Sequence, residues 1–266
     1  MRFFHDTAVL QSIWLKYTET MTKRDLSKDQ FIRSIEIHWE EIPENSYLRE
    51  IDALHNVTEV SFRSPVTVFT GENGSGKSTL LEAVAENAGF NAEGGSKNYS
   101  FSTYNAHSAL QEYSSLIRGG RREKWGYFLR AESFFNVATQ EEEYARIGGV
   151  QSAEYHSMSH GESFLGLAVD KFENRGLYLL DEPEAALSVQ RQMALLSVIH
   201  RSVQNGSQFL IVTHSPILMG YPDAEILTFD DGPIHPIAWE DTDSYRLTKL
   251  FLNYRERILQ DLFAEE

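Results

Sequence analysis

The sequence has 266 residues, a length that suits one large α/β domain or two small ones. Hydrophobic residues make up 41% and charged residues 24%, which excludes a disordered or fibrous protein. The net charge of −15 argues against binding nucleic acid over the whole surface, and the absence of cysteine excludes disulfides, a thiol nucleophile and cysteine zinc sites.

The first 30 residues have mixed polarity and are interpreted as an N-terminal extension, with residues 31–266 forming a single domain. Arg2, His5 and Asp6 interrupt the opening apolar stretch, so it does not resemble a signal peptide. No apolar run approaches the ~20 residues that span a bilayer. We therefore expect a cytoplasmic protein with no integral membrane segment.

Regular secondary structure is predicted from residue 31 onward. Apolar residues predict strands at 31–39 and 57–62, which form an antiparallel β element near the amino terminus. A β-branched run at 66–70 predicts a buried strand, followed by a helix at 78–88. Residues 91–157, rich in Gly, Ser, Asn and Tyr, are interpreted as a small side lobe around one strand at 127–130.

Helices and strands then alternate. Helices are predicted at 161–171 and 185–204, and strands at 177–180, 209–213 and 226–229. Apolar residues of the second helix fall on one face, which predicts that this face is buried. They are Val189, Met193, Leu196, Ile199 and Val203. The alternation predicts an α/β fold with a mostly parallel sheet flanked by helices.

A glycine-rich loop follows the strand at 66–70. It reads Gly71-Glu72-Asn73-Gly74-Ser75-Gly76-Lys77-Ser78-Thr79 and fits the pattern G-x-x-x-x-G-K-[ST]. Glycines let successive N–H groups turn toward phosphate oxygens, and the following helix adds its positive end. We expect Lys77 to reach the β- and γ-phosphates and the Ser78 hydroxyl to bind Mg²⁺. A turn that merely caps a helix is the alternative, which the strand before the loop and the helix after it disfavour.

Polar residues also follow two other predicted strands. Asp181 and Glu182 come directly after the strand at 177–180, and His214 follows the strand at 209–213. Because parallel strands end at one edge of a sheet, these residues are expected near the nucleotide. Asp181 is predicted to hold Mg²⁺, Glu182 to polarise the attacking water, and His214 to contact the γ-phosphate or that water. A solvated turn and a structural histidine are the alternatives.

Ser159-His160-Gly161-Glu162 precedes the helix at 161–171. Alone, this tetrapeptide is a capping box, in which Ser159 and Glu162 satisfy backbone N–H groups. A helix start with Gly161 is also a site for an anion. The order in the chain favours function, because the tetrapeptide lies between the phosphate loop and the acidic pair.

With these motifs in this order, the chain resembles P-loop ATPases of the ABC superfamily, and is nearer to SMC, RecF and DNA-repair heads than to transporter subunits. The resemblance assigns Lys77, Ser78 and Thr79 to Walker A, and Asp181 and Glu182 to Walker B. It assigns Ser159, Gly161 and Glu162 to the signature motif, and His214 to the switch histidine. It implies ATP and Mg²⁺ as cofactors, ATP hydrolysis, and an ATP-dependent head-to-tail homodimer in which Ser159 and Gly161 act in trans.

Two departures from the family pattern are visible. Arg130 stands where the family's metal-coordinating glutamine is expected, with Glu132 or Gln140 as substitutes. The interval from 89 to 158 has no sustained heptads, so the chain resembles a compact head without a coiled coil, as in small bacterial ATPases with a Ser-His-Gly-Glu-Ser signature.

Three functions remain open on sequence alone. A basic run beside Trp125 supports a switch or motor in DNA maintenance or defence, although such runs are usually only solvated. It consists of Arg118, Arg121, Arg122 and Lys124. The second candidate is a nucleotide-dependent regulator of an effector protein without nucleic acid. The third, the energy subunit of a membrane transporter, is disfavoured by the altered signature and the arginine at 130.

Overall fold

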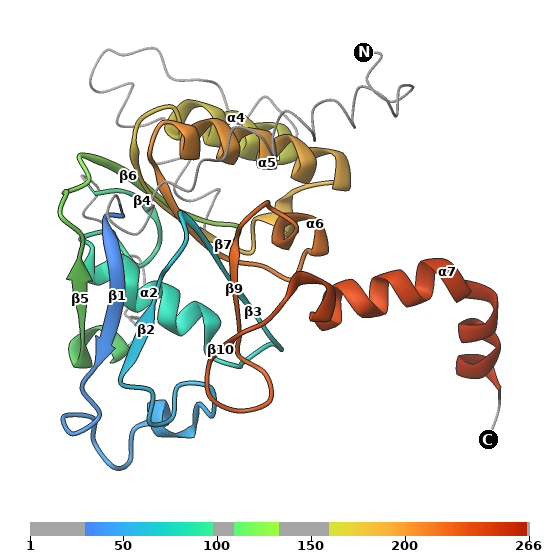
Figure 1. Cartoon of the computed structure of the whole chain (residues 1–266), viewed down its shortest axis with the longest axis horizontal. Helices are drawn as coiled ribbons and strands as arrows, with labels where there is room; N and C mark the ends of the chain where they lie inside the picture. Colours follow the sequence, from blue (N-terminus) through green and yellow to red (C-terminus); the bar gives the residue numbers. More distant parts are fainter. Residues whose placement is uncertain (1–29, 98–108, 133–159, 265–266) are drawn as a thin grey trace.

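The computed structural model describes residues 30–97, 109–132 and 160–264, which form two β-sheets with helices around the larger one (Figure 1). The smaller sheet is antiparallel, with the order β2-β1-β5. Its strands are β1 (Ile32–Ile37), β2 (Glu59–Ser61) and β5 (Ser114–Arg118).

The larger sheet has the order β10-β9-β3-β8-β7-β6-β4, and its five central strands run parallel. Its strands are β3 (Val66–Thr70), β4 (Gly95–Ser96), β6 (Trp125–Arg130), β7 (Gly176–Asp181), β8 (Gln208–Val212), β9 (Glu225–Thr228) and β10 (His235–Pro236). The short strands β4 and β10 add antiparallel edges. The prediction of an α/β fold with a mostly parallel sheet is confirmed.

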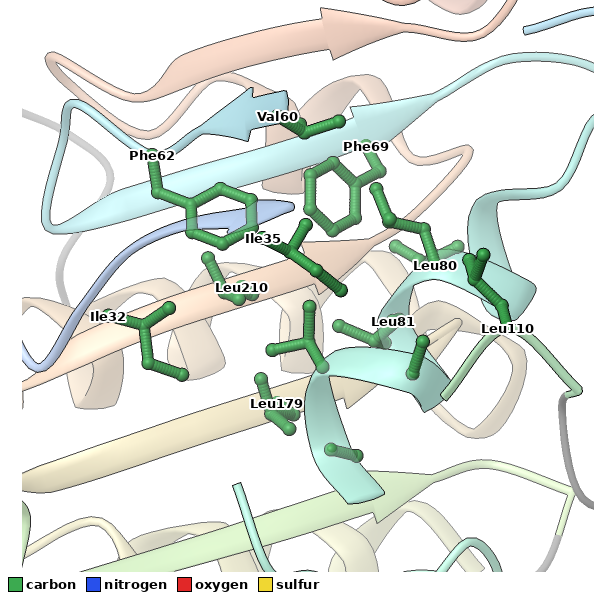
Figure 2. Close-up of a cluster of buried hydrophobic side chains, with 14 of the residues drawn as sticks. Ile32, Ile35, Val60, Phe62, Phe69, Leu80, Leu81, Leu110, Leu179 and Leu210 are labelled. Atoms are coloured by element: carbon green, nitrogen blue, oxygen red, sulfur yellow. The ribbon is translucent and has the colours of Figure 1, made fainter. Parts of the chain in front are cut away.

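Two apolar cores cover opposite faces of the larger sheet, because successive side chains of a strand point to opposite sides. Phe69 of β3 packs with Leu80 and Leu81 of α2 (Lys77–Asn87) and with the smaller sheet (Figure 2). Val68, on the other side of β3, packs with Phe164 of α4 (His160–Lys171) and with α5 (Val189–Gln204). The helix that follows the glycine-rich loop and the helix of the signature motif therefore lie on opposite faces.

A buried glutamine connects the two sheets. Gln208, at the start of β8, accepts hydrogen bonds from the backbone N–H groups of Phe31 and Ile32, both at 3.0 Å. Its amide nitrogen donates to the Ile32 carbonyl at 2.8 Å. Because buried backbone groups need partners, this side chain fixes where β1 begins relative to the larger sheet.

The segment expected to form a side lobe contributes to both sheets. β6, which contains the predicted strand at 127–130, pairs in parallel with β7 inside the larger sheet. β5 pairs with β1 in the smaller sheet. Residues 98–108 and 133–157 of the expected lobe lie outside the described residues, and the division of the chain at residue 30 stays a prediction.

The prediction of a helix at 185–204 is wrong in two respects, its start and its buried face. The segment contains a short helix η5 (Pro183–Ala186), a break, and then α5, which Ser188 begins by accepting a hydrogen bond from the Arg191 N–H. The predicted buried face is displaced, since Val189 is 60% exposed while Ile199 is fully buried. The pattern misleads because polar Gln192 occupies the inner face of α5, where its side chain is hydrogen-bonded.

The remaining helices follow the sheet strands or connect them. They are η2 (Tyr47–Glu50), η3 (Ala109–Tyr113), α6 (Pro216–Met219), η6 (Trp239–Asp241) and α7 (Asp243–Phe263). Figure 1 shows α7 extending away from the sheets, and none of its residues is buried. Within the described ranges, every helix is too short or too polar to cross a lipid bilayer.

Candidate nucleotide site

The glycine-rich loop at residues 71–79 connects the buried strand β3 to α2. Gly71, Gly74 and Gly76 have φ angles of 143°, 82° and 100°, values that residues with a Cβ rarely adopt. At Gly76, the N-cap of α2, a Cβ would also lie 2.6 Å from Ile51 Cγ2. The loop therefore needs glycine for both its conformation and its packing.

Lys77 is buried inside this loop, with 3% of its surface exposed. Its ammonium group donates hydrogen bonds to the carbonyl oxygens of Gly71 at 2.8 Å and Glu72 at 2.6 Å. Burial lowers the pKa of Lys77, while the carboxylates of Glu182 and Asp230 oppose that shift. The loop thus holds its lysine with backbone acceptors at the place where the sequence predicts phosphate.

Ser78 and Asp181 meet at the start of α2, where the Ser78 hydroxyl donates to Asp181 Oδ1 at 3.1 Å. Asp181 ends β7, and burial raises the pKa of its carboxyl from 3.8 to about 6, although Arg130 and the Ser78 hydroxyl oppose the change. A hydroxyl beside one carboxylate suits Mg²⁺, which prefers oxygen ligands and completes its shell with water and phosphate oxygens. The described residues contain no group of three or more His, Cys, Asp or Glu side chains placed to hold a metal ion.

Glu182 and His214 lie at the ends of neighbouring strands, with 3.8 Å between Glu182 Oε1 and His214 Nε2. Glu182 adopts a left-handed conformation with a φ of 48°, and its N–H donates to the Val212 carbonyl at 2.9 Å. The His214 N–H donates to Glu184 Oε1 at 2.5 Å. His214 Nε2 is buried and makes no hydrogen bond within the described residues.

A cavity of about 330 Å³ lies beside these residues. It is lined by Ser78, Arg130, Ala131, Glu132, Asp181, Glu182, Ala185 and Ala186. The structure therefore brings together a predicted metal ligand pair, the predicted general base and the arginine found where a glutamine was expected. Glu132 also reaches this cavity, whereas Gln140 lies outside the described residues. Glu72, Asn73 and Gly74 form the exposed tip of the glycine-rich loop, and Ser75 and Thr79 are partly buried.

Gly161 and Glu162 of the predicted signature motif lie in the first turn of α4, on the other face of the sheet. Ser159 is outside the described residues, but Gly161 is buried in the first turn of α4. A Cβ at Gly161 would lie 2.6 Å from Arg191 Nη1 and 2.9 Å from the Ala186 carbonyl oxygen. Glu162 forms an ion pair with Arg191 at 3.1 Å. The first turn of α4 is therefore packed against η5 and α5.

The sequence interpretation missed Asp230 at the same edge of the sheet. Asp230 Oδ1 accepts a hydrogen bond from the Glu72 N–H at 2.8 Å and lies against Gly71. The sequence did contain a signal for this residue, because Asp230 follows the strand predicted at 226–229 just as Asp181 and His214 follow their strands. This carboxylate orients the entry to the phosphate loop.

Comparisons with known proteins place the chain among P-loop ATPases. Residues 46–142 match a family model described as "AAA domain", and residues 105–220 match one described as "AAA domain, putative AbiEii toxin, Type IV TA system". Translation initiation factor RLI1 of Saccharomyces cerevisiae is 27% identical over 193 residues, which cover 68% of this chain and 30% of RLI1. The cytochrome c biogenesis ATP-binding export protein CcmA of Rhizobium johnstonii is 28% identical over 166 residues, covering 56% of this chain and 75% of CcmA. This chain thus spans less than a third of RLI1.

The chain also matches two solved structures at low sequence identity. The SMC head domain from Thermotoga maritima matches at 15% identity with a TM-score of 0.44, covering 78% of this chain and 99% of that one. The cbiO1 protein of Clostridium perfringens, part of an ABC transporter complex, matches at 13% identity with a TM-score of 0.46, covering 86% and 97%. On the family matches, the glycine-rich loop and the parallel sheet, the chain carries a P-loop ATPase domain of the AAA/ABC type.

Proposed function

We propose that this chain binds ATP with Mg²⁺ at residues 71–79 and hydrolyses it, acting as a cytoplasmic switch. The observation that best supports this is the contact of 3.1 Å between the Ser78 hydroxyl and Asp181, which joins the phosphate loop to the acidic strand end. Glu182 and His214 lie beside that contact at the ends of β7 and β8. Such a site has a place for phosphate, a place for a cation and a base for water.

Residues of this chain would carry each part of ATP binding and hydrolysis. Lys77 exchanges the carbonyl oxygens of Gly71 and Glu72 for phosphate oxygens, which are stronger acceptors because they are charged. Ser78 and Asp181 would hold Mg²⁺, which when bound neutralises charge on the phosphate oxygens. Glu182 accepts a proton from the attacking water. His214, whose Nε2 lies 3.8 Å from the Glu182 carboxylate, bonds to the γ-phosphate or orients that water.

The arrangement also supports a dimer that forms head to tail around ATP. The first turn of α4, which contains Gly161, is packed against η5 and α5, on the face of the larger sheet opposite α2. A second copy could present its own Ser159 and Gly161 to the nucleotide held by the first. Binding of the triphosphate would then stabilise association, and hydrolysis would release the two copies.

Sedimentation velocity tests this proposal. A Glu182→Gln variant should bind MgATP but hydrolyse it slowly, so it should sediment as a dimer with MgATP and as a monomer without it. The double variant with Lys77→Ala is the matched control and should remain monomeric under both conditions. If Glu182→Gln remains monomeric while binding MgATP, the dimer is rejected and the ATPase proposal stands.

For the cellular role we propose DNA maintenance or defence, and one matched family is described as a putative toxin of a type IV TA system. A specific observation favours the alternative of an effector protein without nucleic acid. In the basic run, Arg118 is already bonded to Glu123 at 3.0 Å and to the Asn87 carbonyl at 3.1 Å. The basic run lies just before the first residue of β6, and Arg130, at the last residue of β6, lies at the nucleotide site. The basic run and the nucleotide site therefore lie at opposite ends of one strand.

DNA binding measured over a salt series separates these roles, because phosphate contacts weaken steeply with salt. Salt-sensitive binding that stimulates the ATPase, and that is lost when the exposed Arg122 and Lys124 become serine, would support the DNA role. Absence of binding at low salt would favour the effector. Co-purification with a permease would instead support the transporter role, which we consider the weakest.

A further inference from the structure

Contacts with three parts of the chain hold the Arg130 side chain at the wall of the cavity. It ends β6 and pairs in register with Asp181 on β7. Its Nη1 contacts Glu82 Oε1 of α2 at 2.6 Å and donates to the Ala92 carbonyl at 3.0 Å. Its guanidinium also lies over the Phe128 ring, 5.6 Å from the centroid. Only 17% of the side chain is exposed, so the cation is held in place before any ligand arrives.

The same guanidinium shares the Asp181 carboxylate with Ser78. Arg130 Nε lies 3.3 Å from Asp181 Oδ2, while the Ser78 hydroxyl donates to Oδ1. A single carboxylate therefore separates Arg130 from the residue predicted to hold Mg²⁺. Both Arg130 and Ser78 line the cavity of about 330 Å³.

An arginine at this position cannot do what a glutamine does. Glutamine offers a carbonyl oxygen to a metal, whereas the guanidinium has five N–H donors and no acceptor. Two of its nitrogens are occupied, Nη1 by Glu82 and Ala92 and Nε by Asp181, and no described residue accepts a hydrogen bond from Nη2. A fixed cation with donors to spare suits an anion, and a phosphate group is the ligand that such a fork binds well.

We propose that Arg130 donates to the terminal phosphate of a bound nucleoside triphosphate within the same chain, in place of a metal-coordinating side chain. The inference rests on the proposed ATP site. Glu82 serves as a positioning residue, because its carboxylate holds Nη1 and so aims the rest of the guanidinium at the cavity. Arg130 then distinguishes a triphosphate from a diphosphate, which has no γ-phosphate to receive the hydrogen bond.

Equilibrium binding of AMP-PNP and ADP in the presence of Mg²⁺ tests this inference. In Arg130→Gln, the affinity for AMP-PNP should fall by about 10-fold or more, as expected for a charge-assisted hydrogen bond, while the affinity for ADP stays within about twofold. Arg130→Lys, which keeps the charge but loses the fork, should lie between wild type and Arg130→Gln. Arg201→Gln, an exposed substitution on α5, is the matched control and should bind both nucleotides like wild type.

Three results would overturn the inference. Equal losses for AMP-PNP and ADP would mean that Arg130 only supports the pocket. Unchanged or tighter AMP-PNP binding would mean that Arg130 merely neutralises Asp181 until a metal displaces it. If the wild-type chain binds neither nucleotide, the ATP proposal itself fails, a result that the wild-type titration reveals before any variant is compared.

Discussion

Replacing Asp181 with asparagine should remove a pH-dependent cost to the stability of the nucleotide-free protein. Burial raises the pKa of the Asp181 carboxyl from 3.8 to about 6, so above pH 6 the folded protein must keep a charge that it disfavours. Because the pKa is higher in the folded state, the unfolded chain binds fewer protons between these values, and stability falls as the pH rises. With each pKa unit worth about 1.4 kcal/mol, the cost is about 3 kcal/mol at pH 8 and about half of that at pH 5.

Urea unfolding at pH 5 and pH 8, in EDTA and without nucleotide, measures this difference. In Asp181→Asn the asparagine can still accept a hydrogen bond from the Ser78 hydroxyl or the Arg130 guanidinium. From pH 5 to pH 8, the free energy of unfolding of wild type should fall by about 1.4 kcal/mol more than that of the variant. Asp223→Asn is the matched control, because Asp223 is exposed at a turn and its φ of 59° suits asparagine. If Asp181→Asn and wild type change in parallel between pH 5 and pH 8, Asp181 does not carry the burial cost assigned to it.

Two further substitutions test the packing that positions the site. Gly161→Ala places a Cβ 2.9 Å from the Ala186 carbonyl oxygen, a backbone atom, and should lower the free energy of unfolding by about 1–3 kcal/mol while also weakening the ATP-dependent dimer, which urea unfolding and sedimentation would measure. A fully stable variant would show that the turn has room to spare. Gln208→Ala leaves the buried N–H groups of Phe31 and Ile32 without their acceptor and should cost about 2–4 kcal/mol in urea unfolding. A cost near zero would mean that another group connects the two sheets.

Much of the site was predictable because it follows from one rule, that parallel strands end at the same edge of a sheet. The rule explains why Asp181 contacts Ser78 of the glycine-rich loop, and why Glu182 and His214 lie together, although these residues are far apart in the sequence. The same rule applied to the strand at 226–229 points to Asp230, which the sequence interpretation overlooked. The loop itself was recognisable because its glycines have backbone conformations that other residues rarely adopt.

The contacts of Arg130 could not be predicted from the sequence. They depend on the register between β6 and β7, which places Arg130 opposite Asp181, and on the position of α2, which supplies Glu82. Neither relation leaves a local pattern. The face of α5 was mispredicted for a related reason, because Gln192 is buried through hydrogen bonds to groups distant in the sequence, and a hydrophobic pattern does not detect such a residue.

The central claim, that the loop at residues 71–79 encloses a triphosphate held by Lys77, is tested most directly by isothermal titration of MgATP into wild type and Lys77→Ala. We expect saturable binding to wild type with one nucleotide per chain. Lys77→Ala should show no measurable binding, although it should be folded and keep the wild-type unfolding midpoint. Equal affinity in the two proteins would contradict the claim, because the nucleotide would then be bound somewhere other than beside the lysine that this loop buries.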